Sequence, residues 1–264
     1  MEGYDRSSYG DAFADVYDDW YRGIGDVDAT AECVAEIAAA ARGSTRGPDG
    51  GHAPARVLEL AIGTGRLALP LAGRGLAVEG VDASAAMLER LAAKDPEARV
   101  RTVLGDMVDD LPDGPFDVVL LAYNSLFLLE SEARQAACFA AVAARLSPGG
   151  AFVVEAFVPD EPPRSGTAVD VRSMTADEVV VSISVHDPDE QRAAGHFVSF
   201  TDGERVRLRP WAIRYAAPAE LDAMAASAGL DLRHRWSDFR RRPFDRDSPF
   251  HVSVYQGRDR QRGR

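Results

Sequence analysis

One segment, residues 57–68, constrains the fold of this chain more than any other. It reads Val-Leu-Glu-Leu-Ala-Ile-Gly-Thr-Gly-Arg-Leu-Ala, an apolar run typical of a buried strand that passes through Gly63 and Gly65 into a helical pattern. Glycines at such a turn let the backbone approach a ligand closely, because a Cβ atom would block the approach. Open α/β sheets bind nucleotides at the carboxyl ends of their strands. The segment therefore predicts an α/β domain with a nucleotide site after its first strand.

The remainder of the first 160 residues alternates between strand-like and helical patterns. We expect a helix at 28–42 with Asp28 as its cap, and three more at 66–74, 84–94 and 132–146. Strands are expected at 56–61, 77–81, 100–104, 116–121 and 151–157. Strands that alternate with helices at this spacing indicate right-handed βαβ units and a parallel sheet.

The pattern changes after Pro159. Strand-like runs at 168–172, 178–186, 195–201 and 205–215, separated by turn sequences, predict an antiparallel meander. A helix at 218–229 and two strands at 231–237 and 251–256 complete the pattern. We therefore divide the chain into a main domain (1–160 and 216–257, with an aromatic lid segment at 1–25), an inserted β meander at 161–215 over the substrate cleft, and a disordered tail at 258–264.

Composition excludes several classes of partner. The net charge of −12 over 264 residues argues against nucleic acid, whose phosphates call for a basic surface. No apolar run is long enough to span a membrane and no signal peptide is recognisable, so we expect no membrane partner and a cytoplasmic location. Cys33 and Cys138 lie in alanine-rich helical patterns, which favours core residues over a disulfide. No spacing of ligand residues suggests a metal site.

Two acidic residues bear on the ligand's identity. Glu59 precedes Gly63 by four positions, which is out of place beside a pyrophosphate but suits a positively charged ligand, and so points to S-adenosylmethionine rather than a dinucleotide. Asp82 follows Gly65 by 17 positions, near the spacing at which a carboxylate binds ribose hydroxyls. Each has a structural alternative: Glu59 as an acceptor for N–H groups of the loop, and Asp82 as a helix cap.

With these residues in place, the chain resembles the class I S-adenosylmethionine-dependent methyltransferases over roughly residues 12–257. The resemblance rests on Glu59 with the glycine turn, Asp82, Gly105-Asp106-Met107, Phe116-Asp117, and Ser147-Pro148-Gly149-Gly150, in the family's order. Ala61 stands where the family often has its earliest glycine. The resemblance implies a Rossmann-like seven-stranded sheet with an antiparallel last strand and helices on both faces. It also implies S-adenosylmethionine as cofactor and S-adenosylhomocysteine as product.

The resemblance also implies site residues. Asp82 would bind the ribose and Asp106 the adenine amino group, while Met87 is either an adenine contact or a core residue. The N-terminal segment is similar to the entry segment of amino-sugar N-methyltransferases, where aromatic residues close over the cofactor; its aromatics would otherwise only pin a terminal helix. The cofactor-binding residues expected are Tyr17, Tyr21, Glu59, Ala61, Gly63, Gly65, Asp82, Ala83, Met87, Gly105, Asp106, Met107, Ala122 and Tyr123.

The sequence identifies no catalytic residue. An amine acceptor needs only alignment with the methyl group, whereas a hydroxyl acceptor benefits from a general base. His186, His196 and Asn124 are candidates, although a structural role is open for each. Expected substrate-lining residues are Asn124, Phe127, Phe157, Trp211 and Arg214.

We therefore expect methyl transfer to an N or O atom of a small molecule, such as a sugar or another secondary metabolite, by a monomer or homodimer. Two alternatives stay open. An NAD(P)-dependent oxidoreductase is one, because Gly63, Gly65 and Ala68 fit the dinucleotide pattern. The other is a catalytically inactive module that binds S-adenosylmethionine.

Overall fold

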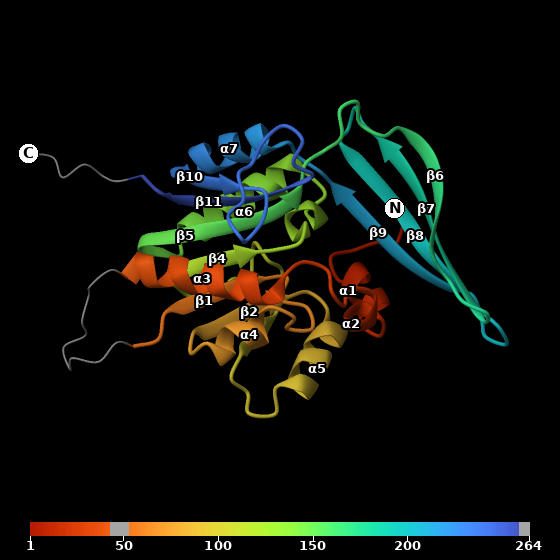
Figure 1. The fold of residues 1–264 in the computed structure, drawn as a ribbon, viewed down its shortest axis with the longest axis horizontal. Helices are drawn as coiled ribbons and strands as arrows, with labels where there is room; N and C mark the ends of the chain where they lie inside the picture. The colour runs from red at the N-terminus through yellow and green to blue at the C-terminus, as the bar shows by residue number, and fades with distance from the viewer. Residues whose placement is uncertain (43–52, 259–264) are drawn as a thin grey trace, which may run out of the picture.

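The computed structural model describes residues 1–42 and 53–258, and its centre is a seven-stranded sheet (Figure 1). The strands are β1 (Arg56–Leu60), β2 (Ala77–Asp82), β3 (Arg101–Leu104), β4 (Phe116–Leu121), β5 (Leu146–Phe157), β10 (Leu230–Trp236) and β11 (Phe250–Gly257). Their order is β10-β11-β5-β4-β1-β2-β3. β1 to β5 are parallel and β11 is antiparallel to β5. The predicted fold class is therefore confirmed.

Helices cover both faces of this sheet. The helices α3 (Val27–Arg42), α4 (Ala68–Gly73) and α5 (Ala85–Lys94) contribute to one apolar cluster, and α6 (Glu132–Ala143) and α7 (Pro218–Ser227) to the other. The prediction that Asp28 caps α3 is wrong: the Asp26 carboxylate accepts the Ala29 N–H at 2.9 Å, and Asp28 lies in the first turn of the helix. None of the helices in the described ranges has the length and apolar character needed to cross a bilayer.

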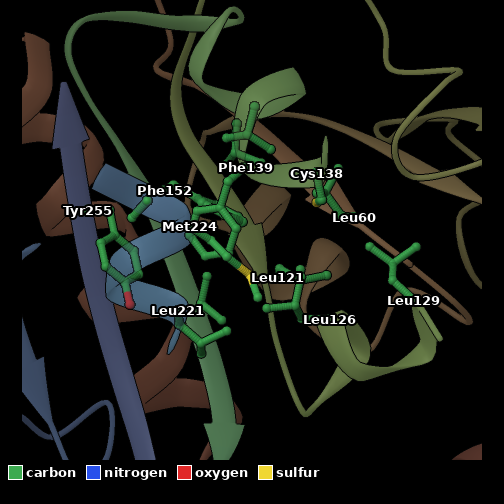
Figure 2. Close-up of a cluster of buried hydrophobic side chains, with 14 of the residues drawn as sticks. Leu60, Leu121, Leu126, Leu129, Cys138, Phe139, Phe152, Leu221, Met224 and Tyr255 are labelled. Carbon is green, nitrogen blue, oxygen red and sulfur yellow. The ribbon is translucent and has the colours of Figure 1, made fainter. Parts of the chain in front are cut away.

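Aromatic packing organises the cluster under α6 and α7. Phe139 of α6 packs against both Phe152 of β5 and Tyr255 of β11 (Figure 2). The ring centroids of Phe139 lie 5.1 Å from those of Phe152 and 5.6 Å from those of Tyr255, both in edge-on geometry, and all three side chains are fully buried. β5 begins at Leu146, earlier than predicted, since residues 146–150 already lie extended beside β4.

A second sheet forms from the predicted meander. Its antiparallel strands, in the order β6-β7-β8-β9, are β6 (Gly166–Met174), β7 (Glu178–Asp187), β8 (Arg192–Thr201) and β9 (Arg207–Arg214). Figure 1 shows this sheet standing at one end of the main sheet. Most of the predicted disordered tail, residues 259–264, lies outside the described residues.

Two short helices that the sequence did not predict, α1 (Ser8–Phe13) and α2 (Tyr17–Trp20), lie between the two sheets (Figure 1). Arginines from the second sheet hold them. Arg209 donates to Asp15 at 2.6 Å, Arg207 also pairs with Asp15, and Arg172 donates to the carbonyl of Trp20 at 2.9 Å. The N-terminal segment is thus clamped to the second sheet.

The Phe139 side chain dominates its cluster, so we expect Phe139→Ala to lower the free energy of unfolding by about 3–5 kcal/mol. Phe250→Ala, which truncates a phenylalanine that is 41% exposed, should cost far less. Urea unfolding followed by circular dichroism checks both; similar losses for the two variants would contradict this account of the core.

Candidate functional site

The turn after β1 has the backbone conformation that its glycines suggest. Gly63 and Gly65 have φ values of +55° and +78°, and Ala61 also has a positive φ, +51°. A left-handed conformation costs a residue with a Cβ roughly 1–2 kcal/mol, so a glycine would be less strained at position 61. A Cβ on Gly65 would lie 2.8 Å from Cγ of Leu91 in α5, which requires glycine there for helix packing.

Carboxyl groups surround this turn in a poorly solvated environment. Burial raises the pKa of Glu59 to about 8, although Arg66 opposes the rise; Asp82 adds to it. One carboxyl oxygen of Glu59 has no hydrogen-bond partner. Burial also raises the pKa of Asp82, even though its carboxylate accepts the N–H groups of Gly63 at 2.7 Å and Ser84 at 2.9 Å. The turn therefore offers a cation two carboxyl groups that solvent does not stabilise.

Asp82 does not cap α5 by itself. The hydroxyl of Ser84 accepts the Met87 N–H at 3.2 Å and is the cap of that helix, while Asp82 binds the N–H of Ser84 just before it. Asp82 therefore joins the glycine turn to the start of α5.

Arg66 was not among the predicted site residues. Its guanidinium lies 5.6 Å from the Tyr123 ring centroid and donates to the Ile24 carbonyl at 3.0 Å. Its charge also opposes the upward pKa shifts that burial causes at Glu59 and Glu155. The position of Arg66 directly after Gly65 could have indicated a role in the site. The orientation of its side chain depends on the hydrogen bond to Ile24 of the N-terminal segment, which the sequence does not reveal.

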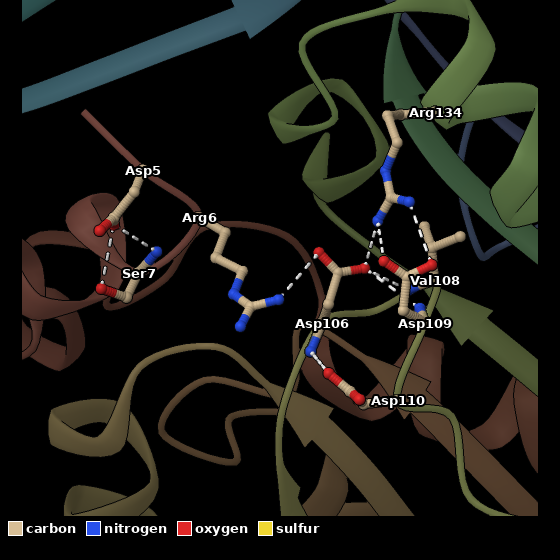
Figure 3. Close-up of polar contacts among 8 residues, drawn as sticks. All are labelled: Asp5, Arg6, Ser7, Asp106, Val108, Asp109, Asp110 and Arg134. Atoms are coloured by element: carbon tan, nitrogen blue, oxygen red, sulfur yellow. Dashed lines mark hydrogen bonds and ion pairs between the residues drawn. The ribbon is translucent and has the colours of Figure 1, made fainter. Parts of the chain in front are cut away.

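Asp106 lies at the far end of the cleft, between two arginines (Figure 3). Its Oδ1 accepts Arg134 at 2.6 Å and the Val108 N–H at 2.8 Å, and Arg6 lies 3.9 Å from Oδ2. The Asp106 N–H donates to Asp110 at 2.7 Å. Oδ1 of Asp106 is thus held by Arg134 and Val108, whereas Oδ2 lies toward Arg6, which lines the cleft.

A continuous cleft connects the glycine turn with Asp106. The predicted residues that line it are Tyr17, Ala61, Gly63, Asp82, Ala83, Met87, Asp106 and Met107. Sequence analysis missed its other lining residues, Arg6, Tyr9, Gly10, Ser125, Leu128 and Leu129. Gly65, Gly105 and Ala122 belong to the same loops but do not line it, and Glu59 lies behind it.

A second cavity of about 260 Å³, here called the aromatic chamber, shares Tyr9, Tyr17, Ser125 and Leu128 with the cleft. Tyr9 and Tyr21 are joined through their hydroxyls at 3.0 Å, and the rings of Tyr21 and Tyr123 are 5.6 Å apart. Its other lining residues are Asn124, Phe157, Phe197, Trp211 and Ile213. The chamber is therefore mostly aromatic.

Burial makes the hydroxyls of Tyr9, Tyr17 and Tyr123 in the chamber hard to ionise. It raises the pKa of Tyr123 to about 12 and those of Tyr9 and Tyr17 well above the usual value. At neutral pH these phenols keep their protons, so they offer hydrogen bonds and electron-rich faces rather than negative charge.

Asn124 lines the chamber but its side chain is already engaged. Tyr123 and Asn124 both have positive φ values, +50° and +65°, in the turn after β4. The Asn124 Oδ1 atom accepts the Phe157 N–H at 2.6 Å, and Glu155 accepts the Tyr123 N–H at 2.9 Å. Asn124 thus satisfies the backbone at the end of β5, as the structural alternative had it.

The remaining predicted residues are scattered. Phe157 and Trp211 separate the chamber from an outer cavity of about 340 Å³, which His186 lines; its Nε2 lies 2.9 Å from the Ser184 hydroxyl. Burial and, to a lesser extent, Arg164 lower the pKa of His186. Phe127, Arg214 and His196 line neither the chamber nor this cavity. Phe127 lies in the core, and Arg214 donates to Gln135 at 2.8 Å and to Gln191 at 2.6 Å.

Within the described residues, no group of three or more histidine, cysteine or acidic side chains has the geometry of a metal site. The fold and the cleft define an enzyme-like α/β domain whose cofactor site follows the first strand, as in nucleotide-binding sheets.

Comparison with known proteins identifies the class. A family model described as a methyltransferase domain matches residues 57–150. A cypemycin N-terminal methyltransferase from a Streptomyces species is 33% identical over 180 residues, which cover 67% of this chain and 72% of the relative. The solved structure of the CcbJ methyltransferase from Streptomyces caelestis has 38% identity and a TM-score of 0.86, and the match covers 96% of this chain and 99% of that one. The sugar N-methyltransferase KedS8 from a Streptoalloteichus species has 25% identity and a TM-score of 0.66, with 96% and 98% covered.

The chain therefore belongs to the class I S-adenosylmethionine-dependent methyltransferases. It is a methyltransferase and its cofactor is S-adenosylmethionine, as predicted. The oxidoreductase alternative is not favoured.

The raised pKa of Glu59 makes a prediction for the protein without ligand. Between its usual pKa of 4.5 and about 8, the unfolded chain ionises this group while the folded chain keeps it protonated, so Glu59 destabilises the fold increasingly as pH rises. Glu59→Gln should therefore match the parent near pH 5 and become more stable toward pH 8, by up to about 1.4 kcal/mol per pH unit.

Urea unfolding at several pH values measures this difference. Glu97→Gln, which changes an exposed carboxylate, serves as the control and should run parallel to the parent. A parallel curve for Glu59→Gln would contradict the burial argument.

Proposed function

We propose that this methyltransferase transfers its methyl group to an amine nitrogen of a small molecule. The observation that carries the proposal is the composition of the aromatic chamber. Among the described residues that line it, there is no carboxylate, histidine, lysine or arginine. A hydroxyl acceptor benefits from a base that removes its proton, whereas an amine with a free lone pair needs only alignment. Tyr9, Tyr17 and Tyr123, whose pKa values burial raises, keep their protons at neutral pH and so do not act as bases.

The residues of the cleft fit the cofactor by charge. Near the glycine turn, one buried carboxyl oxygen of Glu59 has no hydrogen-bond partner. An ammonium or sulfonium cation would stabilise the ionised form of this carboxyl group. In our assignment Glu59 acts at the methionine end, through the turn or directly on the ammonium. Arg66, which lies within electrostatic reach of Glu59, would bind the carboxylate of the cofactor's methionine moiety.

At the nucleoside end, Asp82 lines the cleft and would accept two hydrogen bonds from the ribose diol. Asp106 would accept from the adenine amino group, with Met107 and Met87 on the faces of the ring. Gly63, Gly65 and Gly105 shape the loops that carry these groups. Ala61 and Ala83 would supply small contacts, and Ala122 would support the turn after β4 from outside the cleft. Tyr17, Tyr21 and Tyr123 would enclose the methyl group.

When bound, S-adenosylmethionine supplies a methyl group on a positively charged sulfur. The chain's own task is to place the acceptor nitrogen in line with that methyl group, about 3 Å away, and to exclude water. Tyr9 and Tyr17 border both the cleft and the chamber, so they stand where the methyl group would cross. Their aromatic faces suit a cationic centre, and their hydroxyls can orient an amine without taking its proton. The nitrogen loses its proton to solvent after transfer.

The relatives support nitrogen as the acceptor atom. Two of the similar proteins are an N-terminal methyltransferase and a sugar N-methyltransferase by name. Phe157 and Trp211, at the boundary between the chamber and the outer cavity, are the substrate contacts that we retain from the sequence. Phe127 and Arg214 would support these walls from behind rather than contact substrate.

Asp82→Ala tests the assignment of the nucleoside end. Loss of two hydrogen bonds to a diol should weaken binding of S-adenosylhomocysteine by about 1–3 kcal/mol, which is roughly 5- to 150-fold. Isothermal titration calorimetry measures it, with Asp177→Ala, an exposed turn residue of the second sheet, as the control. Unchanged affinity for Asp82→Ala would show that the assignment is wrong.

A second experiment tests the acceptor atom. Purified protein is incubated with S-adenosylmethionine and a panel of amino sugars and terminal-amine peptides, each paired with its hydroxyl analogue. We expect S-adenosylhomocysteine release and a 14-dalton mass increase with one or more amines and none with their hydroxyl partners. Methylation of hydroxyl analogues alone would refute the proposal. Cofactor binding without turnover on any acceptor would favour the inactive module.

A further inference from the structure

The outer cavity lies between the aromatic chamber and the surface of the protein. Three side chains border both the chamber and the outer cavity: Phe157, Trp211 and Ile213. Four border both the outer cavity and a larger groove at the surface: Pro159, Asp160, Pro163 and Tyr215. The chamber, the outer cavity and the surface groove therefore adjoin one another in this order, from the cofactor side outward.

The chamber is small for a whole acceptor molecule. Its volume of about 260 Å³ lies below the range of about 300–1,000 Å³ in which sites for small molecules usually fall. The outer cavity adds about 340 Å³, which brings the two spaces together well inside that range. An acceptor whose amine lies in the chamber would therefore extend its remaining atoms into the outer cavity.

The inner face of the second sheet forms one wall of the outer cavity. His186 of β7 lies opposite Ala193 of β8, which lies opposite Ile213 of β9, and all three line the cavity. Two residues along β8, Gly195 lies opposite Trp211. Because both of these β8 residues are small, the strand leaves space between the larger side chains of β7 and β9.

Two side chains in the walls of the outer cavity carry polar atoms that lack a partner. Among the described residues, nothing forms a hydrogen bond with the indole N–H of Trp211 or the hydroxyl of Tyr215, and both atoms are shielded from solvent. Tyr215 is 8% exposed. A buried donor without a partner destabilises a folded protein, so each such group calls for an explanation. A ligand with oxygen acceptors in this cavity would satisfy both, once each ring turns toward it.

The charged groups of the outer cavity balance one another. Asp160 and Arg164 both line it, and Arg164 also pairs with Asp170 at 3.3 Å. His186 lies within hydrogen-bond distance of the Ser184 hydroxyl. Burial and, to a lesser extent, Arg164 lower the pKa of His186 below its usual 6.5, so its ring is uncharged at neutral pH. A cavity with this balance favours a neutral group over an anion or a cation.

We propose that the outer cavity binds a second, neutral part of the acceptor molecule, a compact group with several oxygen atoms that form hydrogen bonds. Hydroxyls of a saturated ring and carbonyls of an amide chain both have this chemistry. Trp211 and Tyr215 would then determine specificity, because they supply donors to this group. The site so defined rests on the proposed function, since the amine in the chamber positions the second part. The acceptor is thus a two-part molecule rather than a bare amine.

Binding to the outer cavity can be measured without turnover. The chain has three tryptophans, so a nuclear magnetic resonance spectrum of the isotope-labelled full chain with S-adenosylhomocysteine shows three indole N–H signals. Trp211→Phe identifies the signal of Trp211, and Trp236→Phe, the same change in β10, is the matched control. The probes are methyl galactoside, N-acetylglycinamide and sodium acetate.

We expect a saturable shift of the Trp211 signal with methyl galactoside, with the amide or with both, and none with acetate. Tyr215→Phe should weaken that binding about 3- to 10-fold, because one hydrogen bond is lost. It should not unfold the protein, since the hydroxyl it removes has no partner among the described residues. Trp236→Phe should leave the titration unchanged.

Kinetics provide the second measurement. Glucosamine is compared with lactosamine, which adds a hydroxylated ring, and propylamine with glycylglycinamide, which adds amides. We expect the longer member of one pair to have a kcat/KM at least about 10-fold higher than its short partner. Tyr215→Phe should reduce that advantage about 3- to 10-fold and leave the short amine unchanged.

The two measurements separate the possible failures. A Trp211 signal that moves with neither neutral probe, or with acetate alone, would overturn the proposed site even if amines are methylated. So would a longer acceptor without advantage over its short partner, or an advantage that Tyr215→Phe leaves intact. Methylation of no amine by a protein whose Trp211 signal does shift would instead refute the proposed function and leave the binding site standing.

Discussion

The carboxyl group of Glu59, buried at the end of β1 with one oxygen unpaired, is the constraint around which the site is arranged. An ionised carboxylate in such a place is costly, and its raised pKa expresses that cost. Two features reduce this cost: Arg66 lies within electrostatic reach of the carboxyl group, and the glycine turn keeps backbone groups close to it. The third feature is the cofactor of this enzyme family, which is a cation. Without ligand, the buried carboxyl group of Glu59 lowers the stability of the fold at neutral pH. In our proposal this instability is a form of preorganisation, because the cationic cofactor would relieve it.

Part of the wall of the aromatic chamber comes from two segments outside the main sheet. The short helices α1 and α2 supply Tyr9, Tyr17 and Tyr21, while the second sheet supplies Phe197 and Trp211. Hydrogen bonds from Thr64 to Asp18 and from Ser84 to Asp11, both at 2.6 Å, hold the helices to the cofactor loops. Arginines of the second sheet hold them from the other side. In our proposal, acceptor and cofactor would therefore meet at a surface that forms only when the two segments are docked.

Sequence reasoning reached the parts of this structure that local pattern determines. Alternating strands and helices, the glycine turn and Asp82 carry their signal within a few residues, and the structure places Gly63 and Asp82 in the lining of the cleft. Tertiary contacts decided the rest. Helices of four and six residues are too short to be stable alone, so nothing local announces α1 and α2. Arg214 looked like a substrate contact but is buried against Gln135, which is 79 positions away in the chain. The helix cap at Asp26 rather than Asp28 is a boundary error of two residues.

The clamp between Asp15 and Arg209 joins residues 194 positions apart. During synthesis the N-terminal segment is made well before the second sheet that holds it, which is completed only with β9. Until then its aromatic side chains lack Phe197 as a packing partner. Closing such a long loop carries an entropic cost that the rest of the fold must already offset. The strands β1 to β5 are therefore made before the aromatic chamber can form, and the N-terminal segment is among the last parts of the fold to reach its place.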